Sequence, residues 1–164
     1  MNYFGYINLL QVAYPYLKAS KGRIVVISSF YDSLISPFQG GYAASKHALQ
    51  GFFNTVRQEF LEDGVSVTML SPGGVLTEVQ GKFKDSNGRS TTLELPDLFL
   101  ASSEECASSI LQHAINRIDQ VYFPYYAMLM TNFRRLLQER FDLVFHKLVN
   151  FYFEHGIMKL KINE

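Results

Sequence analysis

Apolar residues along the chain fall into two patterns, short continuous runs and longer stretches with helical spacing. Continuous runs rich in β-branched residues are typical of strands that are buried on both faces of a parallel sheet. These runs predict strands at residues 23–28, 65–70 and 121–123. Apolar residues three or four apart predict helices at residues 3–17, 42–61 and 102–117. Because strands alternate with helices, the sequence predicts an α/β fold with a parallel sheet.

Turn and cap signals mark where these elements end. Gly64 is a natural stop for the second helix, and the Pro-Gly-Gly run at residues 72–74 breaks the chain after the second strand. Ser102 and Glu105 have the spacing of a capping box, which predicts the start of the third helix. Residues 75–101 are mixed in character and predict an irregular or mobile loop.

The C-terminal tail also has helical spacing. Its apolar positions are Phe133, Leu137, Phe141, Val144, Leu148 and Tyr152. Arg134, Arg135 and Lys147 are available for a polar side. Two interpretations stay open: a helix packed on the domain or on a dimer mate, and a helix in peripheral contact with a membrane surface.

Composition excludes some classes of function. A chain of 164 residues with 48% hydrophobic residues has enough material for one folded domain. Its 15 basic and 15 acidic residues balance, which gives no general attraction to nucleic acid, so we expect no nucleic-acid partner. Cys106 is the single cysteine, so an internal disulfide is impossible, and we expect it to be buried in an intracellular protein. The four histidines show no metal spacing, so no metal is expected.

The residues that can carry chemistry lie beside the first strand and the second helix. Ser29 ends the first strand, where ligands bind in open α/β sheets, and Tyr42 follows 13 residues later. Tyr42 and Lys46 are one helical turn apart, so they share a face. A nearby ammonium lowers the pKa of a phenol, which would make Tyr42 a suitable acid or base. The spacing alone is weak evidence, because Tyr14 and Lys18 share it without an assigned role.

Several segments in residues 2–77 occur together in an order and spacing that is specific. They are Asn2 with Gly5, the Pro15-Tyr-Leu run, Gly22-x-Ile-Val-Val-x-Ser-Ser29, Tyr42-x-x-x-Lys46 and Pro72-Gly-x-x-x-Thr77. With these segments the chain resembles the C-terminal part of a short-chain dehydrogenase/reductase. Residues 43–53 are most similar to the branch that contains the 11-beta-hydroxysteroid dehydrogenases.

The resemblance implies a role for each matching residue. Ser29 would hydrogen-bond the substrate oxygen, and Tyr42 would exchange the proton. Lys46 would hold the nicotinamide ribose hydroxyls and depress the pKa of Tyr42. Asn2 would support a water-linked proton path to the lysine. The residues implied at the nicotinamide end of the cofactor are Tyr42, Lys46, Pro72, Gly73, Val75 and Thr77.

Structural alternatives stand beside these roles. Ser29 could simply end a strand, and Asn2 could cap the first helix. Gly73 and Gly74 could form only a turn, and Thr77 could cap a short helix.

The chain lacks one feature that a dinucleotide-binding fold needs. No glycine-rich turn, which lets backbone amides approach the pyrophosphate, occurs in the sequence. The resemblance therefore implies an incomplete Rossmann-like, doubly wound parallel sheet, in which residues 1–125 form the C-terminal half of the dehydrogenase domain and residues 126–164 form a helical extension. The cofactor would be NADP or NAD, with its adenine-binding half absent from this chain. The strand at residues 23–28 should then leave one edge unpaired.

The expected function is an oxidoreductase that interconverts a secondary alcohol and a ketone. The substrate would be a small apolar alcohol or ketone, and the family branch favours a steroid or another lipid-like molecule. The resemblance also implies a dimer formed through the helices at residues 3–17 and 42–61, and a location at the endoplasmic reticulum membrane. The alternative is a truncated, non-catalytic isoform that regulates or dimerises with a full-length enzyme.

Overall fold

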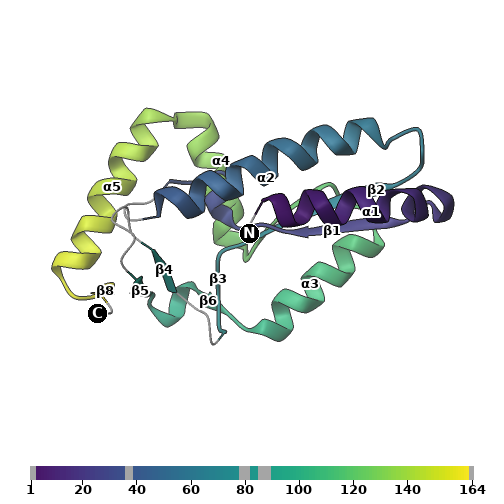
Figure 1. Ribbon diagram of the computed structural model, residues 1–164. Coiled ribbons are helices and arrows are strands. Elements are labelled where there is room, and N and C mark those ends of the chain that lie inside the picture. The colour runs from purple at the N-terminus through teal and green to yellow at the C-terminus, as the bar shows by residue number, and fades with distance from the viewer. Residues whose placement is uncertain (1–2, 36–38, 78–81, 85–89, 163–164) are drawn as a thin grey trace.

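A computed structural model describes residues 3–35, 39–77, 82–84 and 90–162 (Figure 1). The helices are α1 (Phe4–Ser20), α2 (Gly40–Glu59), α3 (Ser103–Ile115), α4 (Tyr125–Leu137) and α5 (Glu139–Glu154), with short 3-10 turns η1 (Phe30–Asp32) and η2 (Asp97–Phe99). The strands are β1 (Arg23–Ile27), β2 (Ser66–Pro72), β3 (Gly74–Val75), β4 (Lys82–Lys84), β5 (Ser90–Glu94), β6 (Leu100–Ala101), β7 (Gln120–Phe123) and β8 (Lys159–Ile162).

A three-stranded parallel sheet of order β1-β2-β7 forms the centre of the molecule. Ile27 pairs with Leu70 across β1 and β2, and Ser71 pairs with Tyr122 across β2 and β7. Helices α1 and α2 lie on one face of the sheet and α3 lies on the other (Figure 1). The predicted α/β class and its parallel sheet are therefore confirmed.

Residues on β2 alternate between the two faces of the sheet, as the two-residue period of a strand requires. Val67 and Met69 are buried against the α1 and α2 side, where Phe53 lies in the same cluster. Leu70 is buried on the other side with Cys106. Burial of β2 on both faces explains its continuous apolar sequence.

The prediction of an irregular loop at residues 75–101 was wrong for the strands that the structure describes in this stretch. This stretch holds the short parallel pair β3 and β6, and it also holds β5, which pairs with both β4 and β8 in an antiparallel sheet. β8 lies near the C-terminus, so the pattern around β5 gives no local sign of this partner. Contacts between distant segments override weak local propensity here.

The predicted tail helix is interrupted. α4 ends at Leu137, and Gln138 adopts a positive φ of 39° before α5 begins. The apolar spacing continues across this break, which is why the sequence pattern did not reveal it. Within the described part of the chain, no helix has both the length and the apolar character needed to cross a membrane.

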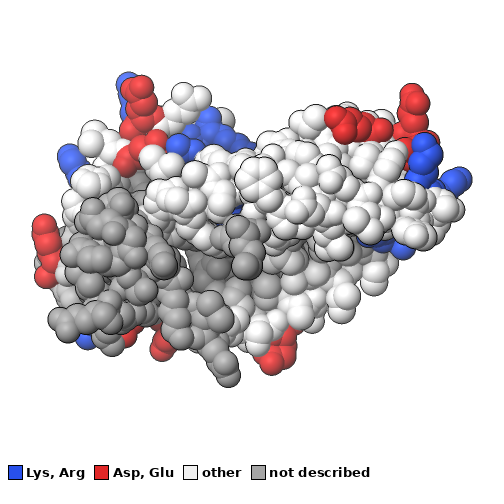
Figure 2. All heavy atoms as spheres, viewed as in Figure 1, with Lys and Arg blue, Asp and Glu red and all other residues white. Residues whose placement is uncertain are grey.

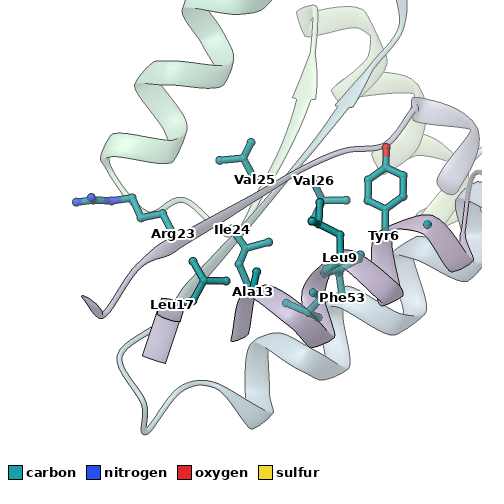
Figure 3. Close-up of a pocket in the computed structure, with 11 residues that line it drawn as sticks. Tyr6, Leu9, Ala13, Leu17, Arg23, Ile24, Val25, Val26 and Phe53 are labelled. Atoms are coloured by element: carbon teal, nitrogen blue, oxygen red, sulfur yellow. The ribbon is translucent and has the colours of Figure 1, made fainter. Parts of the chain in front are cut away.

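β1 is an edge strand, as expected. Among the described strands it pairs only with β2. An open groove of about 410 Å³ runs between β1 and α1, with Leu9, Ile24 and Val26 in its lining (Figure 3). In the view of Figure 2, the surface over α1 and α2 in the middle of the molecule is largely uncharged.

Candidate active site

The site begins where β1 ends. The Ser28 amide donates to the Leu70 carbonyl at 2.8 Å, which extends the strand pairing by one bond. Ser29 then caps η1: its hydroxyl accepts from the Tyr31 amide at 3.4 Å, and its carbonyl accepts from the Asp32 amide at 2.8 Å. Ser29 is buried, and its hydroxyl proton can still be donated to a second oxygen.

α2 brings Tyr42 and Lys46 to the same place. The Lys46 ammonium lies 5.5 Å from the centre of the Tyr42 ring and donates to the Ile27 carbonyl at 3.3 Å. The Ser29 hydroxyl is close enough to the Tyr42 phenol to lower its pKa. The structure therefore brings together the three residues that the sequence singled out around β1 and α2.

The pKa of Tyr42 departs from expectation. Burial raises it above the usual value, and the hydrogen-bonding effect of Ser29 offsets this only in part. The expected lowering by Lys46 is not what the structure shows, since the ammonium points to the Ile27 carbonyl and burial lowers its own pKa. At neutral pH Tyr42 is thus a protonated phenol, the form that can donate a proton.

Two residues near the site were missed by the sequence reasoning. Tyr6 donates from its hydroxyl to the Ile27 carbonyl at 3.1 Å, so this carbonyl accepts from both Tyr6 and Lys46. Asp32, only 2% exposed, accepts hydrogen bonds from the hydroxyls of Ser33 and Ser71. The available signal for Tyr6 was its place one helical turn after Asn2, and for Asp32 it was an acidic residue three positions after Ser29.

The segment that leaves β2 passes close to α4. The Gly73 amide donates to the Phe123 carbonyl at 2.6 Å, and the Gly74 amide donates to the Tyr126 hydroxyl at 2.8 Å. A Cβ at Gly73 would overlap the Tyr126 phenol, and one at Gly74 would overlap the Phe99 backbone. Close packing against backbone therefore requires glycine at position 74, and a side chain at position 73 would displace the Tyr126 phenol.

The other residues predicted at the nicotinamide end of the cofactor lie in different elements. Pro72 ends β2, and Val75 lies in β3, where it pairs with Ala101. Thr77 is exposed just beyond β3. Asn2 lies outside the described residues.

An apolar cavity of about 270 Å³ adjoins the site. Phe30 and Tyr31 of η1 line one side, and the Tyr31 ring lies edge-on to the Tyr42 ring with centres 6.1 Å apart. The remaining lining residues come from η2, α4, α5 and the chain near them. Its aromatic and aliphatic lining suits an apolar small molecule.

The residues present fit the nicotinamide end of a dinucleotide cofactor. An ammonium carries three N–H donors, and the described residues provide Lys46 with a single hydrogen-bond acceptor, the Ile27 carbonyl. Lys46 therefore has donors left for ribose hydroxyls. The described residues contain no cluster of side chains that could hold a metal ion.

Comparisons with known proteins show which family the chain belongs to. The family model described as short chain dehydrogenase matches residues 1–88. An 11-beta-hydroxysteroid dehydrogenase A from Sesamum indicum is 36% identical over 121 residues, which cover 70% of this chain and 34% of the relative. A dehydrogenase/reductase SDR family protein 7-like from Dictyostelium discoideum is 34% identical over 111 residues, which cover 68% of this chain and 34% of the relative.

A solved structure extends the agreement to the fold. A short chain dehydrogenase from Burkholderia cenocepacia in complex with NADP superposes with a TM-score of 0.70 at 24% identity, covering 87% of this chain and 54% of that one. The chain spans about a third of the length of the relatives from Sesamum indicum and Dictyostelium discoideum. With the family model matching more than half of its residues, the chain belongs to the short-chain dehydrogenase family.

Proposed function

We propose that this chain supplies the catalytic half of an oxidoreductase that interconverts a secondary alcohol and a ketone with NADP or NAD. The observation that supports this most strongly is the convergence of Ser29, Tyr42 and Lys46 where β1 ends against α2. A hydroxyl donor, a phenolic acid and an ammonium are the groups needed to orient a carbonyl and to deliver a proton to its oxygen.

Each group has one task in the proposed reaction. The Ser29 hydroxyl donates a hydrogen bond to the substrate oxygen, and Tyr42 transfers its phenolic proton to that oxygen as it becomes an alcohol. Lys46 and the segment formed by Pro72, Gly73, Val75 and Thr77 would hold the nicotinamide end of the cofactor. When bound, the cofactor supplies the hydride that reaches the carbonyl carbon. Asn2 would support proton return to Lys46.

The apolar cavity lined by Tyr31, whose ring contacts that of Tyr42, supports an apolar substrate. Its lining includes Phe99, Phe141, Phe145 and Leu148. Burial of rings and aliphatic carbons in such a cavity favours a substrate of the steroid or lipid-like class over a charged one, because an ionised group would lose its hydration there.

Substitution of Tyr42 tests the proposed function. In a protein that joins this chain to a glycine-rich cofactor-binding half, Tyr42→Phe removes the transferable proton while the ring stays in place. We expect kcat to fall by about 10²- to 10⁴-fold, with the dissociation constant for NADPH, measured by nicotinamide fluorescence, nearly unchanged.

Tyr14→Phe is the matched control, because Tyr14 has the same spacing to Lys18 and binds Asp63 far from the site. This variant should keep full turnover. If Tyr42→Phe turned over ketone as fast as Tyr14→Phe, the proposed acid role would be refuted.

The alternative, a non-catalytic partner of a full-length enzyme, draws support from α1. Phe4, Val12 and Tyr16 of this helix are each at least 70% exposed. A second copy or a related subunit covering α1 and α2 would bury this apolar surface. Co-purification with an intact subunit, combined with no turnover by the chain alone, would favour this alternative.

The contacts of the tail helices α4 and α5 support packing on the protein over contact with a membrane. Arg134 donates to the Ser33 carbonyl at 2.7 Å and pairs with Asp142 at 2.8 Å, while Arg135 donates to the Tyr122 hydroxyl at 3.0 Å. Two of the three basic residues expected on a headgroup-facing side thus bind protein groups. A location at the endoplasmic reticulum stays a proposal that rests on the family branch.

A further inference from the structure

The buried carboxylate of Asp32 connects the parts of the site. Its first oxygen accepts from the Ser33 hydroxyl at 2.9 Å, and its second accepts from the hydroxyl of Ser71. Ser71 directly precedes Pro72, and Gln120 on β7 donates to the same Ser71 hydroxyl at 3.0 Å. The Asp32 carboxylate therefore joins the turn that follows Ser29 to the end of β2.

The same network continues to β7 and α4. The Ser33 hydroxyl bonds to the Tyr122 hydroxyl at 2.8 Å, and Arg135 donates to that phenol at 3.0 Å. Asp32 is thus held from η1, β2 and, through Ser33, β7. A buried carboxylate with this many donors is fixed in position and in turn fixes the groups that bind it.

We propose that Asp32 is a positioning residue that locks the Ser29 turn against the end of β2, so that the substrate-binding serine and the segment beginning at Pro72 keep a constant separation. This inference rests on the proposed function for the roles of Ser29 and Pro72. The position and the charge effect that we assign to Asp32 can be tested without measuring enzyme activity.

Electrostatics around Asp32 supports this placement. Burial raises the pKa of the carboxyl, while the nearby hydroxyls of Ser71, Ser33 and Ser28 and the imidazole of His47 lower it. In its ionised form the carboxylate raises the pKa of three groups, which are Tyr42 and Lys46 on α2 and Tyr122 on β7. Arg135 on α4 acts in the opposite direction on the pKa of Tyr122. Asp32 is thus electrically coupled to the acid and to the ammonium of the site.

The coupling can be measured without turnover. In the full 164-residue chain with ¹³Cζ-labelled tyrosine, the Tyr42 resonance should show an inflection when Asp32 ionises, at a pH above the usual range of an aspartic acid because burial raises the pKa of this carboxyl. Asp32→Asn keeps the shape of the side chain and removes its charge, so the inflection should disappear. Asp32→Ala should in addition move the amide resonances of Ser29 and Gly73, because the link to Ser71 is lost.

Two control variants separate Asp32 from other groups. Asp63→Asn removes a carboxylate that touches Tyr14 instead, and should leave the Tyr42 inflection unchanged. His47→Gln removes an imidazole that lowers the pKa of Asp32, and should leave an inflection in place. If the inflection persisted in Asp32→Asn, or if Asp32→Ala left the Ser29 and Gly73 amides unmoved, the proposal would be overturned.

Ser71→Ala keeps the test decisive if Asp32→Ala does not fold. This variant retains the carboxylate but removes a donor that lowers its pKa, so the inflection should move to higher pH. An unmoved inflection would contradict the proposal. Failure of the proposed function would look different. Tyr42→Phe would keep its turnover, while in the chain that retains Tyr42 the resonances would still respond to Asp32.

Discussion

Lys46 places an ammonium where only 7% of the residue is exposed. Burial lowers its pKa, which means that folding disfavours the charged form. A lysine with a lowered pKa binds fewer protons in the folded state, so its unfavourable contribution is complete below the folded pKa. That contribution is relieved as the pH rises through the folded pKa toward the unfolded value. At neutral pH the residue therefore lowers the free energy of unfolding.

We expect Lys46→Met to raise the melting temperature at pH 7 by about 2–5 °C, because an apolar side chain of similar length replaces a buried charge. Thermal unfolding followed by circular dichroism measures this, and the gain should shrink as the pH approaches the pKa of unfolded lysine. Lys18→Met is the control, since Lys18 is exposed and pairs with Asp63. A lower melting temperature for Lys46→Met would show that its bond to the Ile27 carbonyl outweighs the cost of burial.

The meeting of site residues could be predicted from sequence where it depends on spacing, but the direction of the Tyr42 pKa shift and the burial of Asp32 could not. Tyr42 and Lys46 share a helix face by their spacing, and Ser29 ends a strand, so their meeting could be foreseen. The direction of the Tyr42 pKa could not, because desolvation depends on distant segments that cover the phenol. Asp32 was missed for the same reason: acidic residues are mostly exposed, and nothing local shows that this one is buried.

At the scale of elements, the start of α3 depends on a local signal that is fully formed. The Ser102 hydroxyl accepts from the Glu105 amide at 3.1 Å, and the Glu105 carboxylate accepts from the Ser102 amide at 3.0 Å. This is the capping box that the sequence predicted. Ser102→Ala should therefore lower the free energy of unfolding by about 1 kcal/mol in urea denaturation.

The neighbouring Ser103 provides the control for the cap. It is exposed inside the first turn and donates only to Glu104, at 3.3 Å. Ser103→Ala should change stability little, because alanine is a better helix former than serine. Equal losses in the two variants would show that the capping bond is not what stabilises this end.

Elements were predictable where their signals are local and were missed where their partners are distant. β1 and α3 have complete signals within a few residues, and their bounds were predicted to within a few positions. β5 is stabilised by pairing with β8, and the break at Gln138 leaves the apolar spacing intact. Both features depend on how the C-terminal residues pack against the rest of the chain, and the spacing of apolar residues carries no information about that packing.

At the scale of the whole molecule, the exposed edge of β1 has consequences for solution behaviour. Val25 and Ile27 are 38% and 36% exposed, although they lie in a strand whose sequence is that of a buried one. The adjoining groove between β1 and α1 has an apolar lining (Figure 3). Exposed apolar surface beside an unpaired strand edge attracts hydrophobic molecules and other strands.

We therefore expect the chain to bind the dye ANS, and Val25→Lys to reduce that fluorescence by placing an ammonium beside the groove. Because Val25 is partly exposed, this variant should change the free energy of unfolding by less than about 0.5 kcal/mol. Val26→Lys is the opposite case: Val26 is 1% exposed, so a buried, unpaired charge should cost more than about 4 kcal/mol. Together the two variants distinguish a native exposed edge from a loosely folded chain. A loose chain would tolerate lysine equally at both positions and would keep its ANS fluorescence, whereas a folded one responds in fluorescence at Val25 and in stability at Val26.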